Sequence, residues 1–398
     1  MIEVIGFHHP ELLPPLYQKI IAEAEVLVGG RRHLENFKEF KGPKIFLESP
    51  LEEGLEKIKK FLTRKIVVLA SGDPLFFGIG KRLLSLFPFE ELRFHPSPTA
   101  FQLAFARAKI PWEEAKIISL HGRASWRNLH LEISPFQHVA FLTDHLNTPA
   151  RIASYLLGKG IRAQAIVCEN LALPEEKLSY LSLEEVAQRD FSPLNILILE
   201  KTPQPRRLIF GLPEEEFVKE KGLITKDFLR ALIVAALSPF KEAIVWDLGA
   251  GSGAVGLELA SLCFKGEAYL VEKSPQRVEL IRKNLKRFRL DNVILVPKPI
   301  EEALEELPSP DLVFIGGGFK ALYPKADLFK NKLKASTRIC ATFVCLENLL
   351  KAQKFLTKEG FETKIDLFWA ARGKKILEQA QMFAAENPVF FLKAWREK

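Results

Sequence analysis

Long apolar runs are missing from this sequence. No apolar run in the 398 residues approaches the roughly 20 that span a bilayer. The first residues, MIEVIGF, follow a strand pattern and lack the layout of a signal peptide. We therefore expect a cytoplasmic protein with no membrane partner. Cysteine is also scarce: Cys168, Cys263, Cys340 and Cys345 form no C-x-x-C pair and have no histidine cluster beside them. We predict no metal site and interpret these thiols as buried and reduced.

A strong excess of charge is missing as well. The net charge of +8 is modest for this length and is compatible with an acidic small molecule or with nucleic acid. The densest basic segment, residues 273–290, has Val278, Ile281, Leu285 and Phe288 at helical spacing. Its basic residues therefore lie on the other faces of an amphipathic helix. Both a solvated face and a nucleic-acid patch fit them.

Strand-like and helix-like segments alternate along the whole chain. Several strand-like runs are continuously apolar, as in parallel sheets covered on both faces; examples are 65–70, 138–143 and 195–200. The sequence therefore predicts an α/β protein. The clearest break is TPQPRR at 202–207, which we interpret as a linker between domains at 1–201 and 208–398.

The segment VWDLGAGSGAVGLELA, residues 245–260, has the pattern of a strand, a glycine-rich turn and a helix. Its glycines satisfy the dinucleotide spacing G-x-G-x-x-G, which is a weak signal alone. Asp247 ends the strand before that turn, and a carboxylate there repels a pyrophosphate but suits the sulfonium and ammonium groups of S-adenosylmethionine. We therefore predict an S-adenosylmethionine site at which Gly249, Gly251 and Gly253 let the backbone approach the cofactor.

Two further segments extend this interpretation. Glu272 ends the next strand-like run, a position that commonly binds ribose hydroxyls, although a solvated acid also fits it. In DLVFIGGG, residues 311–318, Gly316 and Gly317 either allow a large flat substrate to approach or form a simple turn. Enzymes that methylate base amines usually have an N/D-P-P-Y/F motif at this point. Its absence argues against a nucleic-acid base methylase.

The segment 222–237 predicts a capped amphipathic helix. One interpretation is a helix that only packs. The other places Thr225 and Lys226 over the cofactor, with Lys226 and Arg230 binding an acidic substrate.

Together these segments resemble a known family. GLITK at 222–226, VWDLGAGSG, DLVFIGG and NPV at 387–389 resemble the class I methyltransferases that decarboxylate corrin precursors, from Gly211 to the C-terminus. Glu347 matches a position in this family that we consider for substrate binding. The chain departs from the family pattern at 296–304 and at Cys345, where the family has threonine. The resemblance implies a cofactor site formed by Thr225, Asp247, Gly249, Ala250, Gly251, Ser252, Gly253, Glu272 and Pro299.

The first half of the chain carries a second resemblance. LASGDPLFFGIG at 69–80, HPSPTAFQLAFARAKIPW at 95–112 and CENLALPEE at 168–176 resemble the tetrapyrrole methylase family over residues 1–201. The resemblance implies two α/β subdomains, 1–112 and 115–201, with S-adenosylmethionine between them. It implies cofactor contacts from Ser71, Gly72, Asp73, Phe76, Thr99, Ala100, Leu171 and either Leu142 or Thr143.

The loop after the first strand departs from that family. The family generally has a G-x-G-P-G turn that faces the tetrapyrrole, whereas this chain has Gly6, Phe7, His8 and His9. The two histidines either contact substrate carboxylates or are exposed loop residues, and both interpretations stay open.

The two resemblances imply a fused, bifunctional enzyme of the precorrin-6Y methyltransferase family or its cobalt counterpart. They imply S-adenosylmethionine in each domain, methylation of carbons 5 and 15 of a corrin precursor, decarboxylation of the carbon-12 acetate, and a homo-oligomer. The ring carbons are already nucleophilic, so alignment and exclusion of water suffice, and we assign no catalytic base. Three alternatives remain: a nucleic-acid methyltransferase with a basic partner domain, a nicotinamide-dependent oxidoreductase, and a non-catalytic cofactor-binding protein.

Overall fold

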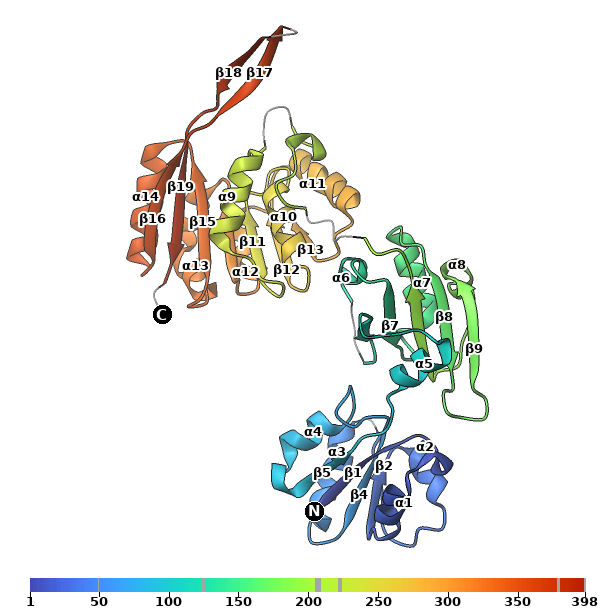
Figure 1. Ribbon diagram of the computed structural model, residues 1–398. Helices are drawn as coiled ribbons and strands as arrows, with labels where there is room; N and C mark the ends of the chain where they lie inside the picture. Colours follow the sequence, from blue (N-terminus) through green and yellow to red (C-terminus); the bar gives the residue numbers. More distant parts are fainter. Residues whose placement is uncertain (49, 123–125, 205–208, 221–223, 378–379, 397–398) are drawn as a thin grey trace. The chain divides into compact units, whose positions relative to one another are not determined.

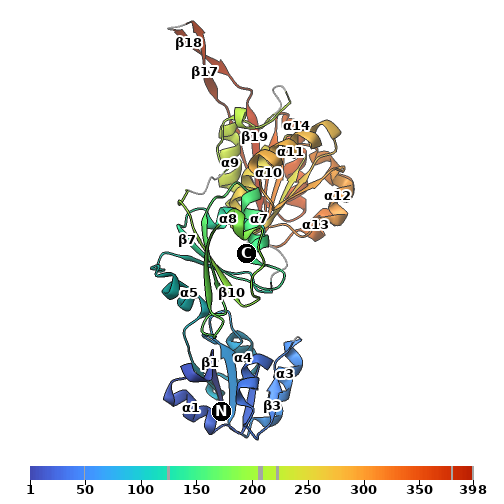
Figure 2. The ribbon, with the colours of Figure 1, turned by 90° about the vertical axis from the view of Figure 1, so that its right-hand side faces the viewer.

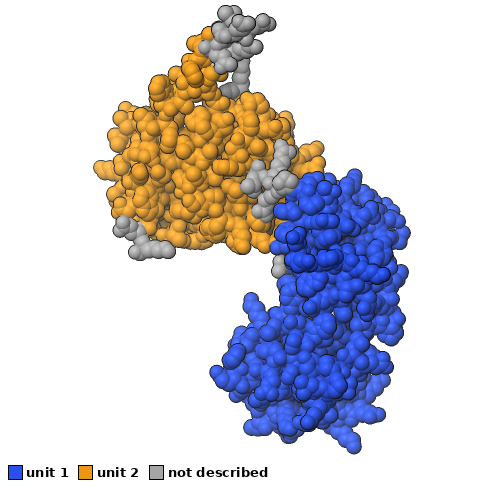
Figure 3. Space-filling view, viewed as in Figure 1, with its two compact units in different colours: residues 1–126, 133–205 blue, residues 127–132, 206–398 orange. Residues whose placement is uncertain are grey.

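The computed structural model describes residues 1–48, 50–122, 126–204, 209–220, 224–377 and 380–396. The chain forms two compact units, residues 1–126 with 133–205 and residues 127–132 with 206–398 (Figure 3). A short piece of the first half, 127–132, therefore belongs to the second unit. The linker predicted at 202–207 lies only partly within the described residues. Among the described helices, none is long and apolar enough to cross a membrane.

The first sheet of the first unit is parallel and has the order β3-β2-β4-β1-β5 (Figure 1). Successive residues of β1 enter two separate core clusters, with Val4 in one and Ile5 in the other. Both faces of the sheet are therefore covered, which explains the continuously apolar strands. The elements are β1 (Ile2–Phe7), α1 (Pro15–Ala22), β2 (Val26–Gly29), α2 (Arg31–Leu34), β3 (Lys44–Phe46), α3 (Leu51–Ile58), β4 (Ile66–Ser71), α4 (Gly80–Leu86) and β5 (Leu92–His95).

The second sheet of this unit is mixed and has the order β6-β7-β10-β8-β9. Strands β6 and β7 pair in parallel, and the other neighbours are antiparallel. The two sheets confirm the two α/β subdomains expected for a tetrapyrrole methylase fold. The elements are α5 (Ala100–Ala108), β6 (Lys116–Ser119), α6 (Leu129–Ile133), β7 (His138–Leu142), α7 (Pro149–Gly158), β8 (Gln164–Glu169), β9 (Lys177–Ser182), α8 (Leu183–Val186) and β10 (Asn195–Glu200).

The second unit has a seven-stranded sheet in the order β13-β12-β11-β14-β15-β19-β16, in which only β19 runs antiparallel to its neighbours. Helices α12, α13 and α14 pack on one face of the sheet, and α9, α10 and α11 pack on the other (Figure 2). The predicted class I methyltransferase fold is confirmed. The elements are α9 (Asp227–Leu237), β11 (Ile244–Leu248), α10 (Ala254–Leu262), β12 (Glu267–Val271), α11 (Pro275–Phe288), β13 (Val293–Val296), α12 (Ile300–Glu306), β14 (Leu312–Ile315), α13 (Ala326–Lys332), β15 (Arg338–Phe343), α14 (Leu346–Lys358), β16 (Glu362–Phe368) and β19 (Val389–Trp395).

A two-stranded hairpin is inserted in the chain between β16 and β19, which pair directly with each other in the seven-stranded sheet. Its strands, β17 (Ala371–Leu377) and β18 (Ala380–Ala385), pair with each other and extend beyond the seven-stranded sheet (Figure 1). Large apolar side chains on and beside the hairpin are exposed, among them Trp369 at 70% and Phe383 at 78%.

Candidate active sites

A cavity of about 750 Å³ opens at the carboxyl ends of β11 and β14 in the second unit; we call it the C-terminal cavity. Strands β12 and β14 flank β11. The chain adds β12 and β13 on one side of β11 and then β14 and β15 on the other side. Open α/β sheets bind ligands at such a switch point. Eight predicted residues line this cavity, namely Thr225, Lys226, Gly249, Ala250, Gly251, Ser252, Gly316 and Gly317.

Two glycine turns meet at the floor of the C-terminal cavity. Gly249 has a φ of +78°, and a Cβ atom there would lie 2.7 Å from the carbonyl oxygen of Gly317. Only glycine combines that backbone conformation with so close an approach. The turn after β11 and the turn after β14 therefore expose bare backbone to a ligand, as a cofactor cradle requires.

Asp247 is buried at the end of β11, and its predicted contact with the cofactor charge stays a prediction. Its side chain is 1% exposed, and its Oδ2 accepts a hydrogen bond from the backbone N–H of Gly256 at 2.8 Å. Burial raises the pKa of Asp247 to about 7, because the charged carboxylate loses its hydration there. The residue ties the end of β11 to the first turn of α10.

Three more of the predicted cofactor residues are absent from the wall of the C-terminal cavity as it is described. Glu272 is 5% exposed and accepts hydrogen bonds from the N–H groups of Gly251 and Ser274, both at 2.9 Å. Gly253 is the N-cap of α10, and a Cβ atom at this position would lie 3.1 Å from the side chain of Leu270. Pro299 precedes α12 as its N-cap. Glu272 thus holds the glycine turn through Gly251, and its predicted contact with the ribose stays a prediction.

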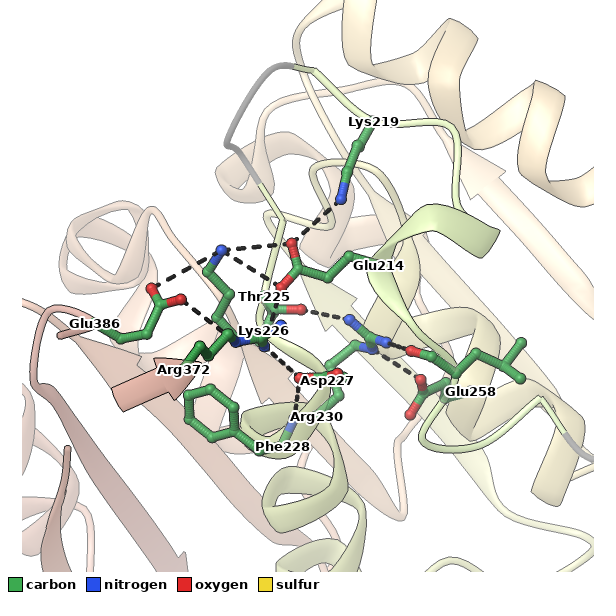
Figure 4. A network of polar contacts seen from close by, with 11 residues as sticks. Glu214, Lys219, Thr225, Lys226, Asp227, Phe228, Arg230, Glu258, Arg372 and Glu386 are labelled. Carbon is green, nitrogen blue, oxygen red and sulfur yellow. Dashed lines mark hydrogen bonds and ion pairs between the residues drawn. The ribbon is translucent and has the colours of Figure 1, made fainter. Parts of the chain in front are cut away.

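Lys226 lines the cavity within a network of charged groups (Figure 4). Its Nζ lies 3.4 Å from the Glu214 carboxylate and 4.0 Å from that of Glu386. Arg372, at the start of the hairpin, pairs with Glu214 and with Asp227. Protein acids therefore hold the Lys226 ammonium group at the rim of the cavity.

Arg230 is placed differently from the prediction that it binds substrate. Its side chain is completely buried, and it forms an ion pair with the equally buried Glu258 at 2.8 Å. Its two terminal nitrogens donate to the backbone carbonyls of Thr225, at 2.5 Å, and of Leu212. The guanidinium group is thus committed to holding the segment before α9 and is inaccessible to a substrate.

The first unit has a cavity of about 900 Å³ between the loops of its two sheets; we call it the N-terminal cavity. Every cofactor residue predicted for this half lies on its wall. These residues are Ser71, Gly72, Asp73, Phe76, Thr99, Ala100, Leu142, Thr143 and Leu171.

Local geometry explains why these residues meet. Gly72 has a φ of +60°, and a Cβ atom there would lie 3.2 Å from the Cα of Thr99. Thr99 caps α5, with its Oγ1 accepting from the N–H of Gln102 at 3.1 Å. The loop after β4 therefore touches the start of α5.

Arg32 and His33, which the sequence analysis missed, reach the same wall from α2. Arg32 donates to the Oγ of Ser71 at 3.1 Å, and Nε2 of His33 lies 3.1 Å from the same oxygen. Burial, together with the charge of Arg32, lowers the pKa of His33 to about 4. A neutral imidazole thus supports the predicted cofactor loop.

The two histidines after β1 separate. His8 lies on the wall of the N-terminal cavity, and its Nε2 is 2.6 Å from the carbonyl oxygen of Pro98. His9 is absent from the residues described on that wall and has its Nδ1 3.9 Å from Glu11, which favours the interpretation of His9 as a loop residue.

Comparisons with known proteins match each half of the chain to a family of methyltransferases. Residues 5–187 match the family described as tetrapyrrole (corrin/porphyrin) methylases, and residues 216–393 match the family described as precorrin methyltransferase domains. The sequence is 32% identical over 306 residues to a precorrin-6Y C(5,15)-methyltransferase (decarboxylating) of Sinorhizobium sp, covering 76% of this chain and 74% of that protein. This chain belongs to the precorrin-6Y C5,15-methyltransferase (decarboxylating) family.

Shorter relatives are each named for one of the two methylations. A cobalt-precorrin-7 C(5)-methyltransferase of Salmonella typhimurium is 35% identical over 206 residues, which cover 50% of this chain and all of that protein. A probable cobalt-precorrin-6B C(15)-methyltransferase (decarboxylating) of Sulfurisphaera tokodaii is 33% identical over 187 residues, which cover 46% of this chain and 95% of that protein.

The structure adds residues to this methyltransferase's C-terminal cavity that the sequence analysis missed. Lys320, Tyr323 and Asn348 line it, and so does Glu386. Glu347, which was predicted, stands outside the described wall and accepts a hydrogen bond from the thiol of Cys345 at 2.7 Å. The signal that could have found Lys320 and Tyr323 is their position just after the glycine run at 316–318.

Proposed function

We propose that this methyltransferase transfers two methyl groups from S-adenosylmethionine to carbons 5 and 15 of a precorrin-6Y ring or its cobalt form and releases the carbon-12 acetate carboxyl group as carbon dioxide. The observation that carries the proposal is the pair of cavities, each with a glycine-based floor at the carboxyl ends of parallel strands. Membership in a family whose relatives are named for these reactions supports it.

The first unit methylates carbon 5, and the second unit methylates carbon 15 and removes the carboxyl group. The match of residues 5–187 to tetrapyrrole methylases and of 216–393 to precorrin methyltransferase domains supports this division. The shorter relatives are named for one reaction each, which supports it further.

Each cavity binds one S-adenosylmethionine, which supplies a methyl group on a positively charged sulfur. In the N-terminal cavity, the proposed contacts are Ser71, Gly72, Asp73, Phe76, Thr99, Ala100, Thr143 and Leu171. In the C-terminal cavity, the proposed contacts are Thr225, Gly249, Ala250, Gly251 and Ser252, with Glu272 reaching the ribose from the tip of β12. The close backbone approach at Gly72 and at Gly249 supports both sets.

The protein aligns the reacting groups and supplies no catalytic base. Nucleophilic ring carbons attack the methyl group once carbon, methyl and sulfur are aligned and water is excluded. In the decarboxylation the bond between the carboxyl carbon and its neighbour breaks, the conjugated ring takes up the electron pair, and a proton from solvent then converts the former methylene carbon into a methyl group. Lys226 binds a substrate carboxylate at the rim, and Gly316 and Gly317 let the flat ring approach.

Mass spectrometry of the product tests this function. The full chain is incubated with S-adenosylmethionine and the precorrin-6Y ring, in its metal-free and its cobalt form. The expected product has two added methyl groups and has lost one carbon dioxide. Calorimetry with S-adenosylmethionine is expected to give two sites per chain. A chain that binds one cofactor or none, or that leaves both rings unchanged, contradicts the proposal.

We further propose that the enzyme is a homo-oligomer joined through its hairpin. Exposed apolar side chains at the hairpin support this, among them Trp369 and Phe383. A second copy that covers them removes apolar surface from water, which stabilises the assembly. Light scattering after size-exclusion chromatography is expected to give a multiple of 45.1 kDa, and Phe383→Lys is expected to reduce it. A wild-type monomer contradicts the proposal.

A further inference from the structure

His8 occupies a central place in the N-terminal cavity. It follows β1 directly, and in the sheet β1 lies between β4 and β5. The loops after β4 and β5 carry the proposed cofactor contacts, at Ser71 and Gly72 on one side and at Thr99 on the other. His8 therefore stands between the two loops that address the cofactor.

The hydrogen bond of His8 fixes which ring nitrogen carries the proton. A carbonyl oxygen can only accept, so Nε2, at 2.6 Å from the carbonyl oxygen of Pro98, is the protonated nitrogen. Nδ1 then carries the lone pair, and within the described part of the chain no hydrogen bond to it is present. Histidines that bind metals have this arrangement: one nitrogen donates to a carbonyl and the other binds the metal.

The chemistry of the ring links the position of its centre to the position of its carbon 5. A meso carbon of a tetrapyrrole is separated from the central metal by one ring carbon and one ring nitrogen. A ring whose carbon 5 faces the cofactor methyl group therefore keeps its centre close to the cofactor loops, where His8 lies. In contrast, no histidine is present among the residues described as lining the C-terminal cavity.

We propose that the first unit binds a cobalt-containing ring and that Nδ1 of His8 is an axial ligand of its cobalt. This inference rests on the proposed function, because it specifies the substrate of the same cavity. An axial ligand anchors the centre of the ring and leaves its rim free, so carbon 5 is presented to the methyl group without a contact that must break during transfer. His8 is thus a residue that selects the metallated ring.

Electron paramagnetic resonance of the full chain with cobalt(II) cobyrinic acid tests the proposal. This probe carries carboxylate side chains and has no nitrogenous base of its own. An axial nitrogen splits the cobalt lines into triplets, and protein labelled with 15N-histidine converts the triplets into doublets. We expect triplets in the wild-type chain and their loss in His8→Ala.

Two matched variants complete the experiment. His9→Ala changes the neighbouring histidine outside the described wall, and we expect it to keep the triplets. His121→Ala removes another wall histidine whose Nδ1 lies near a carbonyl oxygen, that of Thr143 at 3.2 Å, and we expect it to keep the triplets too. Triplets that survive in His8→Ala, or that vanish only in His121→Ala, overturn the proposal, as does a wild-type spectrum without them.

A methyl-transfer assay separates this inference from the proposed function. If the wild-type chain adds a methyl group at carbon 5 but shows no nitrogen splitting, the axial ligand is wrong and the function stands. If neither ring gains a methyl group, the proposed function fails. We expect His8→Ala to lower kcat/KM for the cobalt ring by at least tenfold more than it lowers kcat/KM for the metal-free ring.

Discussion

The two cavities reach a similar backbone cradle by different constructions. In the second unit the floor is formed by neighbouring strands of one sheet, and Gly249 meets Gly317 there. In the first unit the wall combines loops of two sheets, and Gly72 meets Thr99. In both, a glycine with positive φ removes the Cβ atom where two loops touch. The comparison teaches that the close approach of backbone is what the two sites share, whereas their sheets and neighbouring side chains differ.

One buried ionisable group at each cavity has a pKa shifted in the opposite direction from the other. Burial lowers the pKa of His33 to about 4 in the first unit and raises the pKa of Asp247 to about 7 in the second. The cause is the same, since burial penalises the charged form of either group. The two units should therefore respond to pH in opposite directions.

The largest effect is expected for Arg230→Met. The substitution leaves Glu258 buried without its partner, which typically costs about 3–5 kcal/mol. Hydrogen exchange measured peptide by peptide should show faster exchange in the second unit and unchanged exchange in the first. The double variant Arg230→Met with Glu258→Leu should recover most of the loss. An equal increase of hydrogen exchange in both units would contradict the expectation that this ion pair stabilises only the second unit.

Substituting Gly249 or Gly72 should weaken one of the two cofactor sites and leave the other unchanged. In Gly249→Ala the left-handed backbone costs about 1–2 kcal/mol, and the Cβ atom adds a clash with Gly317, so affinity at one of the two sites should fall about tenfold or more. Gly72→Ala should weaken the other site. Calorimetry would show one strong site remaining in each variant. Loss of both sites from one substitution would break the comparison.

The pH dependence of stability should differ between the units. The unfolded state binds more protons at His33 between about pH 6.5 and 4, so this group removes stability from the first unit as the pH falls. The folded state binds more protons at Asp247 between about pH 4 and 7, so this group removes stability from the second unit as the pH rises.

Hydrogen exchange at several pH values measures this difference. His33→Asn should flatten the dependence of the first unit only, and Asp247→Asn that of the second only. Parallel pH profiles of the two units, unaffected by either substitution, would contradict the opposite shifts.

The smallest effect is expected for Lys226→Ala. A partly exposed ion pair contributes about 0.2–1 kcal/mol, so KM for the acidic ring should rise by up to about fivefold. Affinity for S-adenosylmethionine should stay unchanged, and carbon-5 methylation should serve as the internal control. A change in cofactor affinity instead would show that Lys226 supports the cradle and does not contact substrate.

Much of the fold was visible in the sequence because its signals are local. Apolar strands, amphipathic helices and glycine turns lie within short stretches, so 245–260 predicted its strand, turn and helix correctly. The loops of the N-terminal cavity were predicted for the same reason, since each is a contiguous motif. Arg32 and Asn348 were missed because only folding brings α2 and α14 to the cavities.

The sequence by itself determined the α/β class, the two glycine-based turns and many residues on the walls of the two cavities, because these depend on neighbours along the chain. The tertiary structure decided which polar groups face a ligand. It buried Arg230 against Glu258, set Asp247 beneath its turn, and separated His8 from the adjacent His9. A charged side chain either pairs with a group inside the protein or stays accessible to a substrate. Which of the two occurs depends on partners distant in sequence, and only the packed chain brings those partners together.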